Sequence, residues 1–409
     1  MAAGVGLALG SALNHYTLSM FGPALIRELG WSKAQFALVG SLPLLTMVLV
    51  PLAGRFTDRF GTRVAAAVGF TAVPLGFLLM ALMRGSIVEF FAIYVIQHVF
   101  GILTTSMVFC RVVVERFDAA RGIALSIVMS APPLAGAIAA PLLGEVIAGA
   151  GWRAGYFAMA GICAVGGVIA VGMMGRSPAR AATPVEDLRL DRAELFALLR
   201  NPTLLLLIAG MFLVNIPQVF ASSQMKLVVM DSGVADQTAT WMVSLYAIGV
   251  IIGRIASGLA LDRVQPHIVA MAALGLPAIG YLVFASHITA TPLLMAAIMI
   301  IGLAQGAESD IGAFLLSRRF PLKNFSLLLS IMTMMIGVGS AAGSLLMSFT
   351  LHWGGYVPFL LASAVGTLLG AVLFALTGMK RLREPTHAPT AGSTVAGAEL
   401  EQAIKGELA

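Results

Sequence analysis

Apolar runs of membrane-spanning length recur along the whole chain and leave little choice of fold. A transmembrane helix needs about 20 mostly apolar residues, because the hydrocarbon core offers no water to an exposed backbone. Hydrophobic residues make up 59% of the 409 residues and charged residues 11%, whereas soluble domains carry about 25% charged residues. We therefore predict an all-α membrane protein with twelve transmembrane helices. The expected spans are residues 4–26, 35–54, 64–83, 89–111, 122–147, 154–174, 203–228, 238–260, 268–286, 292–316, 326–348 and 356–378.

The longest polar connection lies between the sixth and seventh predicted spans. Its leucines fall near one helical face, with acidic residues early and Arg200 last, as the helix dipole favours. We expect an amphipathic helix on the membrane surface here, and a disordered linker with chance patterning is the alternative. The predicted organisation is an N-terminal six-helix bundle, a cytoplasmic linker, a C-terminal six-helix bundle and a disordered tail, at residues 1–174, 175–202, 203–379 and 380–409.

Lysine and arginine are distributed unevenly between the two faces of the predicted bundle. The even-numbered connections and the tail hold 19 of the 25 basic residues, and the odd-numbered connections hold five. Because cytoplasmic loops carry this excess, both termini are predicted to be cytoplasmic. The net charge of +6 therefore needs no nucleic acid to explain it. The first span starts almost at Met1 without a cleavage site, so we expect a retained helix that lacks a short leader.

Arg254 is the one basic residue left inside a predicted span. An arginine at the bilayer centre costs about 2.5–3.5 kcal/mol on insertion scales, so its presence suggests a function. Its guanidinium matches a carboxylate in bidentate geometry. The equivalent position in the first half is Val50, so only one half carries the charge. We predict that Arg254 anchors an organic anion. The alternative is a structural arginine. It would pair with Glu308 or Asp310, or extend its side chain so that the charge reaches water at the cytoplasmic end of the helix.

Two acidic residues fall within the tenth predicted span. Glu308 and Asp310 are two positions apart and therefore lie on different faces of a helix. Each is a candidate to pair with Arg254 in the empty carrier or to take up a coupling proton. A fixed ion pair with Arg318 or Arg319 at the helix end is the alternative, which suits Asp310 in particular.

Further polar side chains lie within the predicted spans. Histidine titrates in the physiological range, although such a histidine is more often a neutral hydrogen-bond partner between helices. A break in the seventh helix is expected near Asn215 and Pro217. The additional candidates for substrate binding are Asn14, His15, Tyr16, His98, Asn215, Gln218 and Gln305.

No pattern in the chain indicates catalysis. Cys110 and Cys163 lie in apolar segments without metal-site spacing. There is no combination of nucleophile and base and no phosphate-binding loop. We therefore expect no enzyme activity, no cofactor, no metal and no ATP-driven transport.

One short turn occurs twice, 204 residues apart. Each copy reads Gly-x-x-x-Asp-Arg and follows a predicted span, the second or the eighth. Glycine lets helices approach closely, and the charged residues can form ion pairs in one conformation and lose them in another. We predict a gating motif made of Gly54, Asp58, Arg59, Arg63, Gly258, Asp262 and Arg263.

The first copy of this turn resembles the loop signature of the major facilitator superfamily. The second copy keeps the core and loses the trailing glycine, and residues 130–141 are similar to the family's Gly- and Pro-rich fifth-helix motif. The resemblance covers residues 1–380. It implies two six-helix bundles that rock around a central site, each built of inverted repeats. We expect a monomer surrounded by the lipid bilayer.

Several stretches resemble the bacterial oxalate:formate antiporter and monocarboxylate transporter branch of this family, namely residues 21–32, 116–125, 151–153 and 306–320. In that branch an eighth-helix arginine binds the substrate carboxylate, and the matching position is Arg254. Animal members also carry a lysine and an aspartate at the positions of Met20 and Val250. Their scheme of proton coupling therefore cannot be transferred to this chain.

The sequence thus predicts a secondary transporter of the bacterial inner membrane that moves a small organic anion, a monocarboxylate in the first instance. Proton symport and anion exchange are both open as the energy source. One alternative is a facilitator-type exporter of hydrophobic or amphipathic compounds, which would not depend on Arg254. Another is a non-transporting anion receptor, which would bind its ligand without flux.

Overall fold

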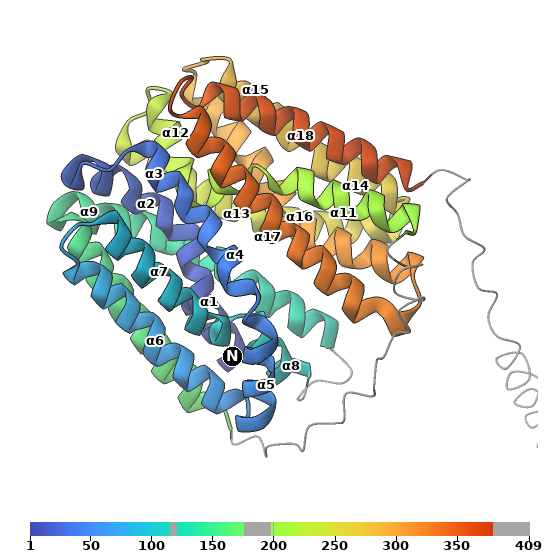
Figure 1. Ribbon diagram of the computed structural model, residues 1–409, viewed down its shortest axis with the longest axis horizontal. Helices are drawn as coiled ribbons and strands as arrows, with labels where there is room; N and C mark the ends of the chain where they lie inside the picture. Colours follow the sequence, from blue (N-terminus) through green and yellow to red (C-terminus); the bar gives the residue numbers. More distant parts are fainter. Residues whose placement is uncertain (115–120, 176–197, 199, 379–409) are drawn as a thin grey trace, which may run out of the picture.

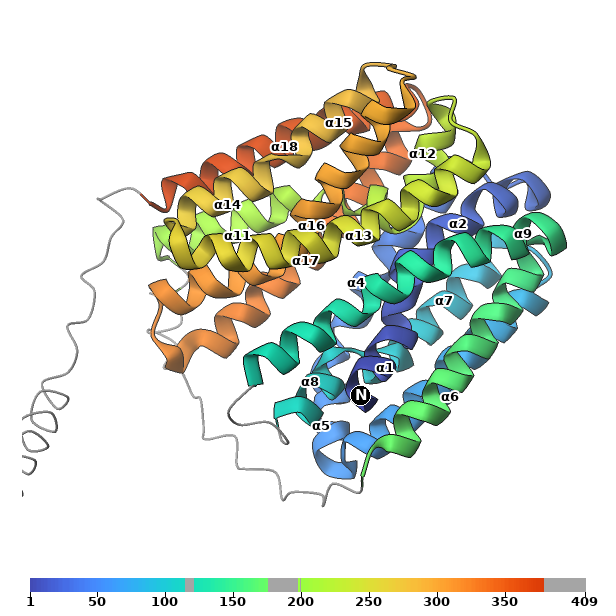
Figure 2. The same cartoon turned by 180° about the vertical axis from the view of Figure 1, so that it is seen from behind.

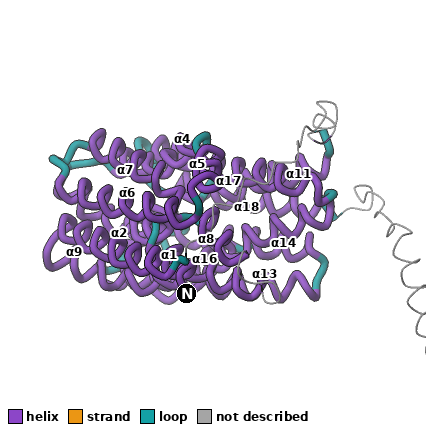
Figure 3. The backbone as a smooth tube through the Cα atoms, turned by 90° about the horizontal axis from the view of Figure 1, so that it is seen from below, coloured by secondary structure: helices purple, strands orange, loops and turns teal. Residues whose placement is uncertain are grey.

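The computed structural model describes residues 1–114, 121–175, 198 and 200–378. All regular elements in these ranges are helical (Figure 3). The predicted linker helix and the predicted tail lie almost wholly outside the described residues. The elements of the first bundle are α1 (Ala2–Leu9), α2 (Ser11–Leu29), α3 (Lys33–Ala37), η1 (Leu38–Ser41), α4 (Leu42–Met47), α5 (Val50–Phe60), α6 (Thr62–Leu82), α7 (Ile87–Gly101), η2 (Ile102–Thr104), α8 (Ser106–Val114) and α9 (Arg121–Met173).

The second bundle begins where Asn201 caps α11 by accepting hydrogen bonds from the backbone of Thr203 and Leu204. Its elements are α11 (Pro202–Asn215), η3 (Phe220–Gln224), α12 (Met225–Asp231), α13 (Asp236–Arg263), α14 (Pro266–Gly275), α15 (Pro277–Ala285), α16 (Thr291–Arg319), α17 (Leu322–Thr350) and α18 (Val357–Leu376).

The number of membrane spans follows from where these helices break. Nine helical stretches of the described chain are long and apolar enough to cross a bilayer, and the pair bent by 55° between Met47 and Val50 makes ten. Two of the predicted spans lie in α9, because Gly151 interrupts it with a φ of 82°. The pair α1 and α2, broken at Gly10, supplies the first span. The prediction of twelve transmembrane helices in two six-helix bundles is confirmed.

Helix seven is also broken, where the sequence predicts it. Helix α11 ends at Asn215, and the chain turns through Pro217 before continuing as the π-helix η3 and as α12. Proline lacks the backbone N–H that a continuous helix requires at this point. The break therefore divides helix seven into two parts with different surroundings.

The two bundles meet at one end of the molecule and part at the other (Figures 1 and 2). Helix α2 contacts η3 and α12, α17 contacts α3, η1 and α4, and α9 contacts α13. By contrast, α5 and α8 make their main contacts within the first bundle, and α11 and α14 make theirs within the second. We call the joined end, which holds α3 and α12, the closed end. The end that holds the two Gly-x-x-x-Asp-Arg motifs is the open end. Both motifs were expected as turns after a span, but they are helical: residues 54–59 lie in α5, and residues 258–263 form the end of α13.

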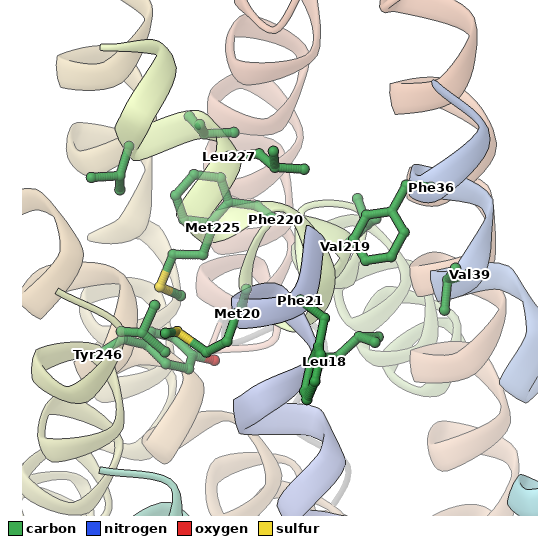
Figure 4. Packing of buried hydrophobic residues seen from close by; sticks show 14 of the residues in the cluster. Leu18, Met20, Phe21, Phe36, Val39, Val219, Phe220, Met225, Leu227 and Tyr246 are labelled. Atoms are coloured by element: carbon green, nitrogen blue, oxygen red, sulfur yellow. The ribbon is translucent and has the colours of Figure 1, made fainter. Parts of the chain in front are cut away.

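Apolar side chains from both bundles form a continuous core at the closed end (Figure 4). Met20 and Phe21 of α2 are buried there together with Phe220 and Leu227 of helix seven. A Cβ atom at Gly22 would lie 3.1 Å from Leu227, so this glycine permits the approach of the two bundles. Burial of these side chains holds the closed end together without requiring polar groups.

Helices α13 and α16 cross at the closest approach that the backbone allows. Gly249 and Gly253 of α13 face Gly302 and Gly306 of α16. A Cβ atom at Gly249 would lie 2.9 Å from the carbonyl oxygen of Met299. Small residues spaced four apart on both helices are the usual basis of such contacts in membranes.

We expect Gly306→Ala to lower the thermal unfolding midpoint of the purified protein, because the new methyl group would meet the backbone carbonyl of Val250, which cannot rotate away. Overpacking of this kind costs about 1–3 kcal/mol. Gly258→Ala is the control, since no atom lies within 4 Å of its Cβ position. That variant should unfold at the wild-type midpoint or above it. Equal midpoints for the two variants would contradict the assignment of a tight crossing.

Candidate substrate site and gates

Arg254 is held by an acidic residue of the neighbouring helix. Its Nε lies 3.5 Å from Oδ2 of Asp310, and the two side chains are 15% and 42% exposed. Nε has no hydrogen-bond partner in the described part of the chain. Of the pairings weighed from the sequence, the structure shows the one with Asp310. The ion pair is loose, so an incoming anion can compete for the guanidinium.

The backbone positions this pair. Gly306 of α16 lies against the backbone of α13: a Cβ atom at Gly306 would lie 2.8 Å from the backbone nitrogen of Arg254. One turn further along α16, Asp310 reaches the guanidinium, while Glu308 points to other partners. The prediction that the two acidic residues occupy different helix faces is thus confirmed.

The first bundle contributes aromatic groups near Arg254. Tyr16 of α2 lies within electrostatic range of Arg254, and its ring centroid is 6.4 Å from that of Tyr246 and 5.0 Å from that of His15. Asn14 of the same helix is buried, and its Oδ1 has no hydrogen-bond partner among the described residues. Arg254 therefore faces the interface between the bundles, where groups from both are available to a ligand.

His98 occupies a different environment. Its ring stacks on Tyr94 of the same helix, with centroids 5.9 Å apart and an interplanar angle of 12°. Neither His98 nor His15 makes a side-chain hydrogen bond to another described residue, so the expected role of a neutral hydrogen-bond partner between helices is not seen. No contact connects His98 to Arg254 within the described ranges.

The remaining candidates gather inside the second bundle. Asn215 Nδ2 donates to Glu308 Oε1 at 2.5 Å, and Gln305 Nε2 donates to Oε2 at 3.2 Å. Gln218 and Tyr281 join Glu308 and Gln305 in lining a small cavity there. Apart from His98, the candidates for substrate binding and proton coupling therefore form two groups. One lies at the interface with Arg254, and the other lies around a cavity lined by residues of α11 and the break that follows it, α14, α15, α16 and α18.

The gating motif is only partly engaged. Asp58 forms an ion pair with Arg111 of α8, and Arg59 lies 5.4 Å from the ring centroid of Phe60. Arg63 is half-buried, whereas Asp262 and Arg263 of the second copy are exposed.

The expected close approach at the motif glycines is not present. The atom nearest to a Cβ at Gly54 is Met107 Sδ, 4.0 Å away, and nothing lies within 4 Å of one at Gly258. The physical reason is that the bundles are apart at this open end.

A polar network at the closed end was missed from the sequence. Lys33 Nζ lies 2.5 Å from Asp231 Oδ1, across the two bundles, and 5.0 Å from the ring centroid of Tyr356. The Tyr356 hydroxyl donates to Gln224 Oε1 at 3.1 Å. Lys33 and Asp231 are 198 residues apart, and no spacing or repeat relates them. Their only signal was a charge at the end of a predicted span.

Reversing the charge of Lys33 should open the closed end. Exposed ion pairs contribute about 0.2–1 kcal/mol, so Lys33→Asp should raise the labelling rate of a cysteine placed at Leu227, behind the pair, by up to about fivefold. Combining it with Asp231→Lys should restore the slow rate. The measurement needs a background without Cys110 and Cys163.

Arg27→Gln serves as the control for this labelling experiment. Arg27 pairs with Glu28 of the same helix at 3.6 Å and bridges no bundles. Its loss should leave the labelling rate unchanged. Fast labelling in the charge-reversed double variant would argue against a gate.

Most of the chain matches a known family of proteins and several solved structures. The family model described as Major Facilitator Superfamily matches residues 7–231 and 220–405. No curated protein matches the chain. The nucleoside transporter NupG is 16% identical, with a TM-score of 0.74 over 93% of this chain and 99% of that one. The D-xylose–proton symporter is 15% identical, with a TM-score of 0.72 over 95% and 98%.

A further similar structure is a bacterial homologue of the human lysosomal transporter Spinster, in an inward-facing and occupied conformation. It is 14% identical, with a TM-score of 0.72 over 94% of this chain and 97% of that one. At such identities these likenesses concern the fold alone. The family match spans most of the chain, and the fold contains the twelve helices that it requires. The chain belongs to the Major Facilitator Superfamily, a family of membrane transporters.

Proposed function

We propose that this protein transports a small organic anion, a monocarboxylate in the first instance, across the bacterial inner membrane. The observation that carries the proposal is the loose pair of Arg254 with Asp310, whose Nε lacks a hydrogen bond among the described residues. A carboxylate that offers two oxygens to the guanidinium forms a stronger, bidentate contact than this pair does. The fold supports alternating access as the mode of transport.

In the empty carrier Asp310 balances the charge of Arg254. An arriving anion takes over the guanidinium and releases Asp310, which is partly exposed and can return to water. Tyr16, with the ring of His15 beside it, approaches from the first bundle. A ligand that contacts both bundles favours whichever conformation brings them together, which is how binding biases a two-state carrier.

The orientation in the membrane forms part of the proposal. If the basic loops face the cytoplasm, the open end is cytoplasmic and the closed end is external. The conformation is then inward-facing, with the helix ends that carry Gly54 and Gly258 available to close the cytoplasmic side. Residues 175–202 would link the bundles on that side, and residues 380–409 would form a cytoplasmic tail.

A second candidate function is supported by an apolar groove of about 350 Å³ on the second bundle. Gly253, Ala256, Ile268, Leu303 and Ala307 are among the residues that line it. A groove of this composition suits a hydrophobic or amphipathic compound, as an exporter of such molecules would require. Binding there would not depend on Arg254, which separates the two proposals.

Arg254→Ala should reduce the ligand-dependent stabilisation of the purified protein to half or less of the wild-type value. Formate, acetate and lactate serve as probes in thermal unfolding. A ligand at 100 times its Kd stabilises the native state by about 2.7 kcal/mol. Loss of charged hydrogen bonds costs about 1.5–3 kcal/mol, so affinity should fall roughly 10- to 100-fold. Arg254→Lys should also weaken binding, since an ammonium group cannot form the planar bidentate contact.

Arg84→Gln is the matched control for Arg254, because it removes an exposed arginine outside the spans. It should keep the wild-type response to the anions. Stabilisation by neutral amphipathic compounds alone, unchanged in Arg254→Ala, would favour the groove and refute the anion site.

Asp310→Asn should change anion affinity in the opposite direction. Without the competing carboxylate, Arg254 is available to the ligand, and the Kd of the best probe should decrease about three- to tenfold, in line with about 1 kcal/mol for a partly exposed ion pair. Weaker binding in this variant would mean that Asp310 contacts the ligand rather than competes with it.

A further inference from the structure

Glu308 is the only acidic side chain among the fully buried residues of the described chain, with 5% exposure. No lysine or arginine of the described residues forms an ion pair with it. Transferring a carboxylate out of water without a cation is costly, and taking up a proton removes the charge. A buried acidic group without a cationic partner therefore suggests a functional role.

The two hydrogen-bond partners of Glu308 suit both of its protonation states. Each carboxyl oxygen accepts one amide N–H, from Asn215 or from Gln305. An amide also has an oxygen that can accept a hydrogen bond from a protonated carboxyl group. Asn215 Oδ1 is buried and has no partner among the described residues. An unused acceptor thus lies in the side chain that already contacts Glu308.

A water-sized cavity adjoins this carboxyl group. It has a volume of about 20 Å³ and is lined by Glu308, Gln305, Gln218, Tyr281 and Thr367, among others. This volume is enough for about one water molecule, and the polar lining supplies the partners that such a water requires. A water in this cavity would adjoin the Glu308 carboxyl group and could exchange a proton with it.

Among the described residues, no other base around Glu308 competes for a proton. The phenols of Tyr246 on α13 and Tyr281 on α15 are close enough to interact with it electrostatically. On its own helix the nearest acidic residue is Asp310, which is paired with Arg254 of α13. Helix α11 contributes an amide and α18 contributes Thr367.

We propose that Glu308 binds the coupling proton of this transporter, at a site separate from the one for the anion. The position of Glu308 would couple its protonation to the closed end. Asn215 ends α11, and the chain four residues later enters the apolar core of the closed end through Val219 and Phe220. A monocarboxylate on Arg254 and a proton on Glu308 would together carry no net charge. Coupling of this proton to anion flux depends on the proposed function, whereas proton binding by Glu308 does not.

Proton binding can be tested without any substrate. Infrared difference spectra of the purified protein, recorded between weakly acidic and alkaline pH above the range in which exposed carboxyl groups titrate, should contain the C=O band of a protonated carboxyl group. The band should be absent in Glu308→Gln and present in Asp310→Asn and in the exposed-residue control Glu145→Gln. In Asn215→Ala, which keeps Glu308, the transition should move to more alkaline pH because a donor to the charged form is lost. A band that persists in Glu308→Gln, or an unmoved transition in Asn215→Ala, overturns the proposal.

Flux measurements test coupling in proteoliposomes with lactate as the probe. An imposed pH gradient should drive accumulation by the wild-type protein. In Glu308→Gln the ratio of inside to outside concentration should fall to one, while exchange of labelled for unlabelled lactate continues. Accumulation by Glu308→Gln at the wild-type level contradicts the coupling role. If Arg254→Ala retains both activities, the anion site is wrong, and the infrared result still decides the proton site.

Discussion

The crossing of α13 and α16 is the contact on which the candidate site depends. Glycines on both helices bring the two backbones together, so that Arg254 and Asp310 meet although they belong to different spans. The same crossing turns Glu308 away from Arg254 and into the second bundle. Lipid supplies no hydrophobic force between helices, so close packing of small residues is a principal source of such a fixed geometry. The positions of Arg254, Asp310 and Glu308 thus depend on the glycines that bring the two helices together.

The interface between the bundles combines two kinds of contact with different consequences. The apolar core around Phe21 and Phe220 excludes water and closes one end. The pair of Lys33 with Asp231 lies at the rim, where both side chains are more than a third exposed. An exposed pair adds little energy, but it is easily exchanged for water. This arrangement suits an interface that must separate repeatedly during a transport cycle.

The sequence alone predicts the fold well because the bilayer sets the length and polarity of each span. Arg254 is recognisable for the same reason, as a charge where the solvent disfavours one. The division of the candidates into two groups was not predictable, because it depends on how α11 and α16 are rotated about their axes. The link between Lys33 and Asp231 is likewise invisible, since only the assembled bundles bring these residues together.

Gly54 and Gly258 carry a further implication. In this conformation an alanine would fit at either position, since no atom lies closer than 4 Å to the Cβ site. Each glycine nevertheless begins the Gly-x-x-x-Asp-Arg motif in its own half of the chain. A residue type that one conformation does not require can still be required by another. We therefore expect Gly54 and Gly258 to be packed closely in the opposite state of the carrier, in which a side chain would not fit.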